Sequence, residues 1–380
     1  MTAERTHELS AVAEPTHGLA TVAEPTHGLS TIADAPPRRS NPDLVALAEP
    51  THGLSTIADA PPRRSNPDLV APAEPRPAER RTSEVSKVAA PAPALPVGGE
   101  WTTWGLVEGA SIAPGRTVLH ELGGGRRYEV YLVWDDHRLA VLVAKVLRPH
   151  QAADADALRE LGREAATLAG LGHPVIVRGF DAVAGGRFPH LLLEHLEGPT
   201  LRELIARDGA LALEQLLPLG LHVAAALHYL AGEGLVHLDV KPENIVMGAP
   251  PRLIDFSVAR TVPAARRLRC PVGTDGYMAP EQCDPVYGPI GPPADVFGLA
   301  ATLWHAIGGR RPFPRRGRER FPQLTRAPQP LPYRVPRELR DLLLAGLVRE
   351  AADRPTAADL ALGLEPLVAA LPRRPVLARR

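Results

Sequence analysis

An aspartate, a lysine and an asparagine lie close together in one polar stretch of the sequence. Lys241 follows Asp239 by two residues, Asn244 follows it by five, and Asp255 comes eleven residues after the asparagine. A tight loop with this spacing can address a hydroxyl, a phosphate and a metal ion together. Asp255, at a nearby strand end, adds a second hard oxygen ligand of the kind that Mg²⁺ prefers. The spacing therefore predicts phosphate chemistry assisted by a divalent metal ion.

The lysine content of the chain supports a special role for two of its lysines. The sequence has 43 Lys and Arg residues, of which only Lys87, Lys145 and Lys241 are lysines. A compact ammonium and a planar guanidinium are not interchangeable, so a lysine kept in an arginine-rich chain indicates a place where only the ammonium fits. Asn244 is likewise the only asparagine after residue 66. Chance placement explains these positions poorly.

A glycine-rich turn lies between two alternating runs at residues 121–131. Glycine lets backbone N–H groups approach phosphate oxygens closely, where a side chain would collide. Alone, the turn is equally well explained as an ordinary hairpin connection. The candidate phosphate-cradle residues are Leu122, Gly123, Gly124 and Gly125, with Val130 on the following strand.

Three motifs together resemble those of the eukaryotic-type (Hanks-type) serine/threonine protein kinases of bacteria, in particular those of actinobacteria, here in a soluble form. They are the catalytic-loop stretch 237–244, the Asp-Phe-Ser triplet 255–257 and the segment 273–281, whose residues read GTDGYMAPE. The resemblance covers residues 112–371. It implies an α+β, bilobal protein-kinase fold with a five-stranded antiparallel sheet and one helix above a mainly helical lobe. Small-molecule kinases are disfavoured because they lack the segment 273–281.

The resemblance implies a role for each candidate site residue. Asp239 would accept or orient the proton of the substrate hydroxyl, Lys241 would neutralise the γ-phosphate, and Thr274 would contact both. Lys145, in an apolar strand over 139–147, would bridge the phosphates of ATP and a glutamate. Glu164 is favoured over Glu160 because it lies at the edge of the inward stripe of a helix over 154–169. The remaining assignments are Asn244 and Asp255 as ligands of Mg²⁺ or Mn²⁺, Val130 and Leu193 at the adenine, and Glu194 to Leu196 as the hinge.

Further pairings and helices follow from the same resemblance. Glu281 would pair with Arg354, and Asp295, opening a helix through residue 306, would hold the catalytic-loop backbone. Strands are expected over 175–181 and 191–194, and a long helix over 213–231. Thr200 is a plausible N-cap for a short helix at the start of the large lobe.

Three departures from the family pattern bear on activity. Tyr128 stands where a third glycine is usual, Leu238 replaces an arginine that often pairs with a phosphorylated activation segment, and Ser257 replaces a glycine. Because Leu238 cannot bind phosphate, activity independent of activation-segment phosphorylation is expected. The chain is thus interpreted as a non-specific serine/threonine protein kinase that uses ATP, acts on protein Ser and Thr hydroxyls and autophosphorylates. A catalytically impaired nucleotide-binding scaffold (pseudokinase) is the alternative.

The first hundred residues have a different composition. They contain no Phe, Trp or Tyr, and residues 23–47 recur almost unchanged at 48–72. Two repeats with paired prolines cannot bury enough apolar surface to offset chain entropy, which predicts a disordered tail over 1–100. The expected domains are this tail, a kinase domain at 112–371 (N-lobe 112–196, C-lobe 197–371) and a short basic end at 372–380. A phosphoacceptor or docking role for the tail is a further hypothesis.

Charge and hydropathy limit the partners. The 43 basic residues balance 43 acidic ones, so neither nucleic acid nor an anionic membrane is indicated as a partner. The two cysteines are too few for a disulfide framework. Neither an apolar signal sequence nor a spanning stretch is evident, which predicts a cytoplasmic protein whose input is intracellular. Protein substrates and ATP are the expected partners, and nothing in the sequence indicates an oligomeric state.

Overall fold

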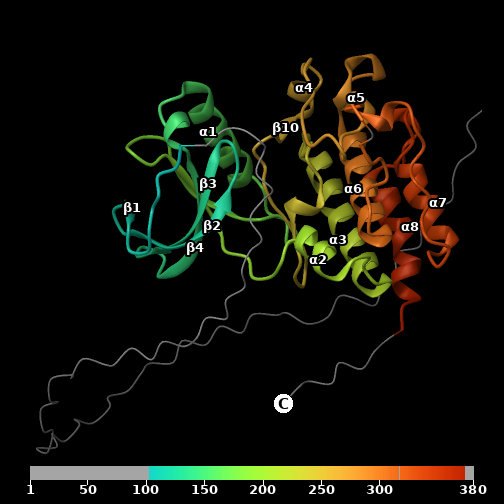
Figure 1. Ribbon diagram of the computed structural model, residues 1–380, viewed down its shortest axis with the longest axis horizontal. Helices are drawn as coiled ribbons and strands as arrows, with labels where there is room; N and C mark the ends of the chain where they lie inside the picture. The colour runs from blue at the N-terminus through green and yellow to red at the C-terminus, as the bar shows by residue number, and fades with distance from the viewer. Residues whose placement is uncertain (1–101, 316, 373–380) are drawn as a thin grey trace, which may run out of the picture. The chain divides into compact units, whose positions relative to one another are not determined.

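The computed structural model describes residues 102–315 and 317–372. The predicted tail over 1–100 and nearly all of the predicted basic end over 372–380 lie outside these residues. The described residues form a lobe dominated by one antiparallel sheet, followed in the chain by a mainly helical lobe (Figure 1). This arrangement confirms the predicted α+β, bilobal fold.

The N-terminal lobe is built on a six-stranded sheet in the order β1-β2-β3-β4-β6-β5. The expected number of five strands was therefore too low by one. The additional strand is β1, which has only three residues and pairs Ser111 with Thr117 of β2. Such a short edge strand leaves little periodic pattern in a sequence. The bounds are β1 Ser111–Ala113, β2 Arg116–Gly124, β3 Tyr128–Asp135, β4 Ala140–Leu147, β5 Gly179–Val183 and β6 His190–Glu194.

Strand β5 begins later than the predicted strand over 175–181. The apolar residues at its expected start bond to a segment of the other lobe instead: the Val177 amide donates to the Leu253 carbonyl at 3.0 Å, and the Leu253 amide to the Val175 carbonyl at 2.6 Å. A continuous apolar run does not reveal which partner its backbone pairs with. Here this run connects the lobes.

Helix α1, Ala155–Ala169, packs on the sheet and matches the helix predicted over 154–169. Its first turn is capped by Asp154, whose side chain accepts a hydrogen bond from the Ala157 amide at 2.7 Å. Leu161 and Leu168 are buried on one face of the helix. Glu164, between them on the same face, is only 2% exposed, so the helix delivers a carboxylate into the interior.

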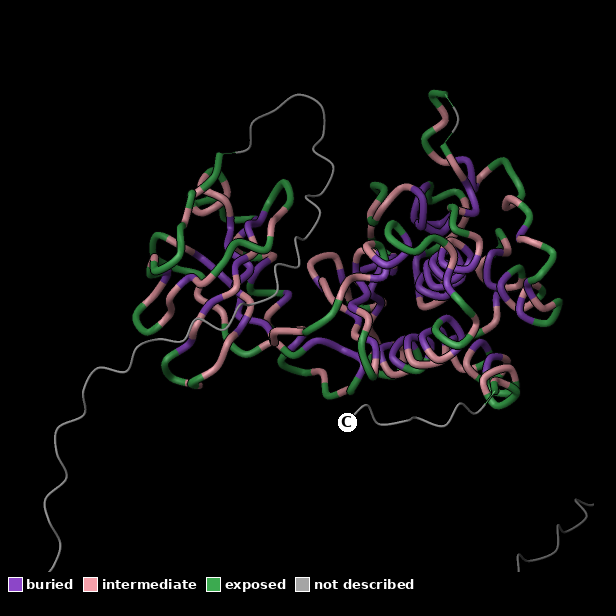
Figure 2. Tube along the Cα trace, turned by 60° about the horizontal axis from the view of Figure 1, so that its bottom comes forward, coloured by how far each residue is buried: buried purple, intermediate pink, exposed green. Residues whose placement is uncertain are grey.

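The C-terminal lobe is organised around α3, which buries one face, and α6, most of whose residues are buried. Buried segments gather inside this lobe in Figure 2. Thr200 caps α2 in a reciprocal capping box with Glu203, as its position predicted. The helix expected from Asp295 begins three residues earlier, because Pro292 and Pro293 occupy its first turn. The bounds are α2 Leu201–Asp208, α3 Leu213–Gly232, α4 Val262–Ala265, α5 Pro280–Cys283, α6 Pro292–Gly308, α7 Arg337–Gly346 and α8 Ala357–Ala369.

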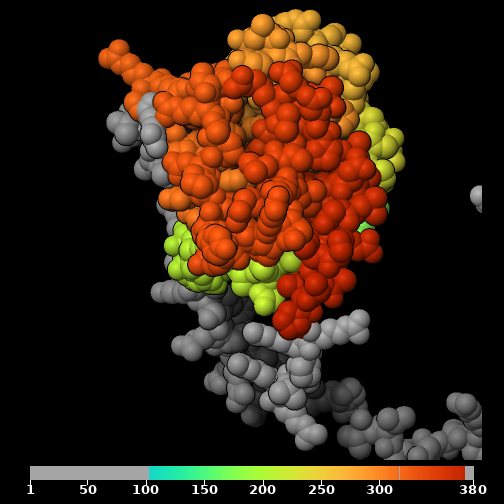
Figure 3. All heavy atoms as spheres, turned by 90° about the vertical axis from the view of Figure 1, so that its right-hand side faces the viewer, coloured from blue at the N-terminus to red at the C-terminus, as the bar shows by residue number. Residues whose placement is uncertain are grey.

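Short strand pairs frame the connections between these helices. They are β7 Leu235–Val236 with β10 Arg260–Thr261, and β8 Ile245–Val246 with β9 Arg252–Leu253. The loop between β7 and β8 carries Asp239, Lys241 and Asn244, and the turn after β9 carries Asp255. The last segments of the described chain, including α7 and α8, cover the face shown in Figure 3. No helix in the described part of the chain is both long and apolar enough to cross a membrane.

Candidate active site

Lys145 joins three elements at the inner face of the sheet. Its ammonium, on β4, lies 2.9 Å from both carboxylate oxygens of Glu164 on α1 and 2.7 Å from Oδ1 of Asp255. The Lys145 side chain is 10% exposed and that of Glu164 is fully buried. The strand, the helix and the loop after β9 therefore meet at one buried cation, and Glu160, the alternative partner, pairs with Arg127 instead.

The charges of this triad depend on one another. Burial by itself would lower the pKa of Lys145, but the carboxylates of Asp255 and Glu164 raise it above its ordinary value. For Asp255 burial alone would raise the pKa, and Lys145 nevertheless holds it below its usual range. Lys145 is therefore a cation and Asp255 an anion at neutral pH.

The catalytic-loop residues form a second polar cluster with Thr274. The Thr274 hydroxyl donates to Oδ1 of Asp239 at 2.7 Å and accepts from the ammonium of Lys241 at 2.7 Å. The same ammonium lies 2.6 Å from Oδ2 of Asp239. The Asn244 side-chain amide donates to the Asp239 carbonyl at 2.9 Å, closing the loop. The sequence predicted these four residues together, and the structure brings them together.

Buried contacts from the helical lobe hold this loop in place. The Asp295 carboxylate on α6 accepts from the backbone amides of His237 and Leu238, each at 2.7 Å. Glu281 and Arg354 form the expected pair, with two N–H···O bonds of 2.7 and 2.8 Å and fully buried side chains. Both pairings were predicted, and the Asp295 carboxylate binds the catalytic-loop backbone directly.

Two side chains of the site come from strained backbone positions. Leu238 has φ of 68° and Asp255 has φ of 63°, in the left-handed region that residues other than glycine seldom adopt. The flanking contacts hold both: Asp295 binds the Leu238 amide, and Phe256, 1% exposed, packs edge-on to His237 at 4.7 Å. Strain of this kind is concentrated at functional sites.

The glycine-rich turn needs glycine at two of its positions. Gly123 has φ of 122°, and a Cβ on Gly124 would lie 2.5 Å from the Tyr128 carbonyl oxygen. At Gly125 an added Cβ would meet nothing within 4 Å, so the turn leaves open space there. This space belongs to a cavity of about 760 Å³ whose wall also contains Val130, Lys145 and Asp255.

Tyr128 occupies part of the wall of this cavity. Its ring centroid lies 4.6 Å from the Lys145 ammonium, and the residue is 8% exposed. Within the described residues its buried hydroxyl has no hydrogen-bond partner. Burial is the main cause of the raised pKa of this hydroxyl. The residue in place of the usual glycine therefore points inward at the Lys145 ammonium instead of outward from the turn.

Not every candidate nucleotide residue lines the cavity. Its walls include Gly124, Gly125, Val130, Lys145 and Asp255, but not Leu122, Gly123, Leu193, Glu194 or Leu196. Glu194, at the end of β6, instead forms an ion pair with Arg252 at 2.5 Å. The sequence also missed wall residues that come from other elements, namely Arg126, Arg127, Gln151, Ser257, Val258, Arg260 and Gly273. Ser257 and Gly273 belong to motifs that the sequence analysis identified, and Arg126 and Arg127 directly precede Tyr128, but no pattern predicted that these residues line the cavity.

The oxygen donors at the two predicted metal ligands suit a magnesium ion. The bond from the Asn244 amide nitrogen to Asp239 leaves the Asn244 side-chain oxygen as a ligand, and Oδ2 of Asp255 accepts no hydrogen bond from any described residue. No cluster of three His, Cys, Asp or Glu side chains in the described ranges could form a closed metal site. Mg²⁺ commonly binds one or two carboxylates together with substrate phosphates, so the two ligands fit an ion that arrives with a nucleotide.

The fold and this pair of clusters define the class of protein. Residues 116–362 match the family described as the protein kinase domain, and the chain belongs to that family. Members of the family bind ATP and divalent metal ions.

The chain is similar to curated serine/threonine-protein kinases of several actinobacteria. The chain is 33% identical to serine/threonine-protein kinase PknA of Mycobacterium tuberculosis over 236 residues, which are 58% of this chain and 54% of the relative. It is 30% identical to PknB of Mycobacterium leprae over 201 residues, 50% of this chain and 32% of the relative. It is 33% identical to the probable kinase PkwA of Thermomonospora curvata over 253 residues, 66% of this chain and 33% of the relative. The chain thus spans about a third to a half of the length of these relatives.

Proposed function

We propose that this chain is a serine/threonine protein kinase that transfers the γ-phosphate of ATP to Ser and Thr hydroxyls of proteins, its own included. One observation carries the proposal: a threonine from the segment 273–281 is hydrogen-bonded to both Asp239 and Lys241. This contact ties the segment that would hold a peptide to the pair that would act on its hydroxyl. Kinase relatives from actinobacteria support the same substrate class.

The roles of the side chains follow from their positions. Asp239 orients the acceptor hydroxyl and takes its proton as the hydroxyl oxygen bonds to the γ-phosphorus and the bond to the β–γ bridging oxygen breaks. Lys241, 2.6 Å from Asp239, places a positive charge where charge develops on the phosphoryl group. Lys145 binds phosphate oxygens from the other side, held there by Glu164. Positioning and charge neutralisation supply most of the catalysis in such transfers.

Asn244 and Asp255 would hold a divalent metal ion, which would neutralise phosphate charge when bound. We propose Mg²⁺ as the physiological ion, with Mn²⁺ as a substitute. The hard oxygen donors of both residues suit either ion. We also propose that residues 112–371 form the catalytic domain, and that the protein acts in the cytoplasm.

Radiolabel transfer from [γ-³²P]ATP tests the proposal directly. The full chain is compared with Asp239→Asn and with Asp341→Asn, a control at a surface carboxylate that is 59% exposed on α7. Label on Ser or Thr of the protein or of a generic acceptor protein should appear with the parent and the control and vanish with Asp239→Asn. ATP binding without transfer by the parent would instead favour a nucleotide-binding scaffold.

We further propose that activity does not need phosphorylation of the activation segment. Leu238 is 3% exposed and presents no cation, and the Arg260 guanidinium already donates to the carbonyls of Ser257 and Ala259. Phosphatase-treated and untreated protein should therefore transfer label at the same rate. Turnover that disappeared on phosphatase treatment and returned on rephosphorylation of the segment would contradict this.

A further inference from the structure

A second cavity opens beside the segment that carries Thr274. It has a volume of about 430 Å³, and Gly273, Thr274, Asp275 and Gly276 form one of its walls. Because the Thr274 hydroxyl bonds to Asp239, whatever enters this cavity lies next to the group that would act on an acceptor hydroxyl. The cavity is distinct from the one at the glycine-rich turn, although Gly273 contributes to both.

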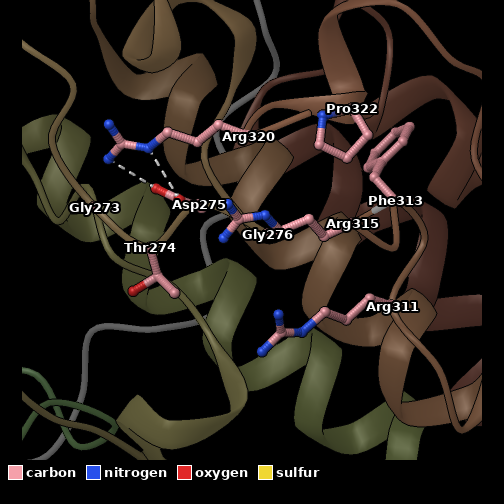
Figure 4. Close-up of a pocket in the computed structure, with 9 residues that line it drawn as sticks. All are labelled: Gly273, Thr274, Asp275, Gly276, Arg311, Phe313, Arg315, Arg320 and Pro322. Carbon is pink, nitrogen blue, oxygen red and sulfur yellow. Dashed lines mark hydrogen bonds and ion pairs between the residues drawn. The ribbon is translucent and has the colours of Figure 1, made fainter. Parts of the chain in front are cut away.

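The opposite wall of this cavity is rich in arginine. Arg311, Arg315 and Arg320 extend from the chain that follows α6, and their guanidinium groups point toward the segment 273–276 (Figure 4). Arg320 is neutralised by Asp275, with N–H···O distances of 3.0 and 3.1 Å. Neither Arg311 nor Arg315 forms an ion pair with any residue that the structure describes. Three cations therefore face a single carboxylate.

This excess of positive charge is local. The whole sequence has equal numbers of basic and acidic residues, so the positive charge at the cavity does not reflect a generally basic chain. His305 adds no charge, because burial and the nearby Arg311 lower its pKa to about 4. Two guanidinium groups with no carboxylate partner attract an anion from outside the chain. Arginine matches carboxylates and phosphates with paired N–H donors.

The cavity wall is held by the core of the lobe. Phe313 is 4% exposed and stacks on Phe297 of α6, with ring centroids 6.0 Å apart. Gln323, also buried, donates to the carbonyls of Asp275 at 2.9 Å and Met278 at 3.0 Å. Arg311 packs over the ring of Tyr277 at 5.3 Å. The site is thus built before any ligand binds, which lowers the entropic cost of binding.

We propose that this cavity is a substrate subsite for an anionic side chain that lies near the acceptor hydroxyl on the same peptide. The ligand is a carboxylate of Asp or Glu, or a phosphate already present on a neighbouring residue. Arg311 and Arg315 bind it, and Arg320 with Asp275 forms the rim. This deepens the proposed kinase function and rests on it, since it names the peptides that such a kinase prefers.

Peptide series with one acceptor serine test the subsite. The full chain is given peptides in which glutamate, phosphoserine, alanine or lysine occupies, in turn, each of the three positions before and after the acceptor. We expect glutamate or phosphoserine at one or two positions to raise kcat/KM about tenfold over alanine, the effect of a hydrogen bond to a charged group. Equal preference for the two anions would indicate a carboxylate site, and a clear excess for phosphoserine would indicate a primed phosphate.

The variant Arg311→Gln/Arg315→Gln assigns that preference to the cavity. Its ratio of kcat/KM for anionic over alanine peptides should fall toward one. Arg337→Gln is the matched control, because it removes an arginine whose side chain is 85% exposed on α7, outside the cavity. A preference for anions that survives in the double variant would overturn the proposal. So would equal kcat/KM values of the parent protein for the anionic and the alanine peptides.

Binding of fluorescent peptides without ATP gives a readout that does not need catalysis. Anisotropy should show the phosphoserine or glutamate peptide binding more tightly to the parent than to the double variant, with affinity weakening as salt rises. Transfer without anion preference would reject the subsite and leave the kinase function standing. Anion-dependent binding without any transfer would keep the subsite and reject the kinase function.

Discussion

The ammonium of Lys145 lies 2.7 Å from Oδ1 of Asp255, although the two residues are 110 positions apart in the chain. Glu164, on helix α1, binds the same ammonium at 2.9 Å. One cation is thus shared by two carboxylates, of which that of Glu164 is fully buried, where an unpaired charge is costly. Any change to one member of this triad alters the charge state of the others.

Lys145→Met should abolish phosphoryl transfer and also destabilise the fold. Without the ammonium, Glu164 stays buried and uncompensated, which costs about 3–5 kcal/mol of the free energy of unfolding. The double variant Lys145→Met/Glu164→Gln should regain part of that stability but no activity. Urea denaturation and radiolabel transfer on the same preparations measure both effects. No recovery of stability in the double variant would contradict the charge argument.

Tyr128→Phe should stabilise the protein in the absence of nucleotide. The wild-type hydroxyl is buried with no partner among the described residues, and such burial costs about 1–3 kcal/mol. The phenylalanine keeps the ring over Lys145 and removes only the oxygen. Chemical denaturation of the nucleotide-free parent and variant gives the difference. A loss of stability would mean that a bound water satisfies this hydroxyl.

Arg354→Met should cost far more stability than a change at a surface arginine. The Arg354 and Glu281 side chains are fully buried, so the variant leaves a buried carboxylate unpaired, at a cost of about 3–5 kcal/mol. Arg337 and Asp341 are 85% and 59% exposed, and Arg337→Gln should cost less than about 1 kcal/mol. Thermal or urea unfolding of the two variants side by side checks the contrast. Similar losses would show that the buried pair contributes little.

His305 should make stability fall as the solution becomes acidic. Burial, aided by Arg311, lowers the pKa of His305 to about 4 in the folded state, where Nδ1 lies 2.7 Å from the Tyr277 hydroxyl. Above a pH of about 6.5, the pKa of histidine in the unfolded chain, His305 is neutral in both the folded and the unfolded state, and its full contribution to stability is present. As pH falls from about 6.5 to about 4, the unfolded state gains the proton first, so stability is lost.

Denaturation at a series of pH values tests this behaviour. The loss should be at most about 2 kcal/mol, since the ring is partly exposed and its surroundings are screened. His305→Gln should reduce the slope of the free energy of unfolding against pH over this range. Glu243 and Arg202, which also act on the His305 pKa, stay unchanged in this variant. An unaltered slope in this variant would assign the pH dependence to other groups.

Local patterns in the sequence were enough to predict the catalytic loop and the helix that carries Glu164. Asp239, Lys241 and Asn244 lie within six residues, so one loop must present them together. Glu164 could be chosen over Glu160 because helical spacing fixes which face a residue occupies. The buried pairs Lys145–Glu164 and Glu281–Arg354 were likewise found from family motifs.

The features that the sequence did not predict depend on contacts between segments that are far apart in the chain. The arginines that face Thr274 follow it by 37 to 46 residues, and no periodicity links the two segments. The inward direction of Tyr128 follows from its register opposite Leu147, which the sequence does not reveal. Strand β1 is too short to leave a pattern, and the walls of the cavity at the glycine-rich turn combine residues from both lobes.

Arg148 joins the beginning of the described chain to the glycine-rich turn. Its guanidinium donates to the Gly125 carbonyl at 2.6 Å, to Glu129 at 3.0 Å and to the Thr102 carbonyl at 3.3 Å. Trp104, two residues further on, anchors the same segment through its indole N–H, which donates to the Leu147 carbonyl at 2.7 Å. The first described residues are therefore fastened to the glycine-rich turn through the Arg148 guanidinium and to the end of β4 through the Trp104 indole.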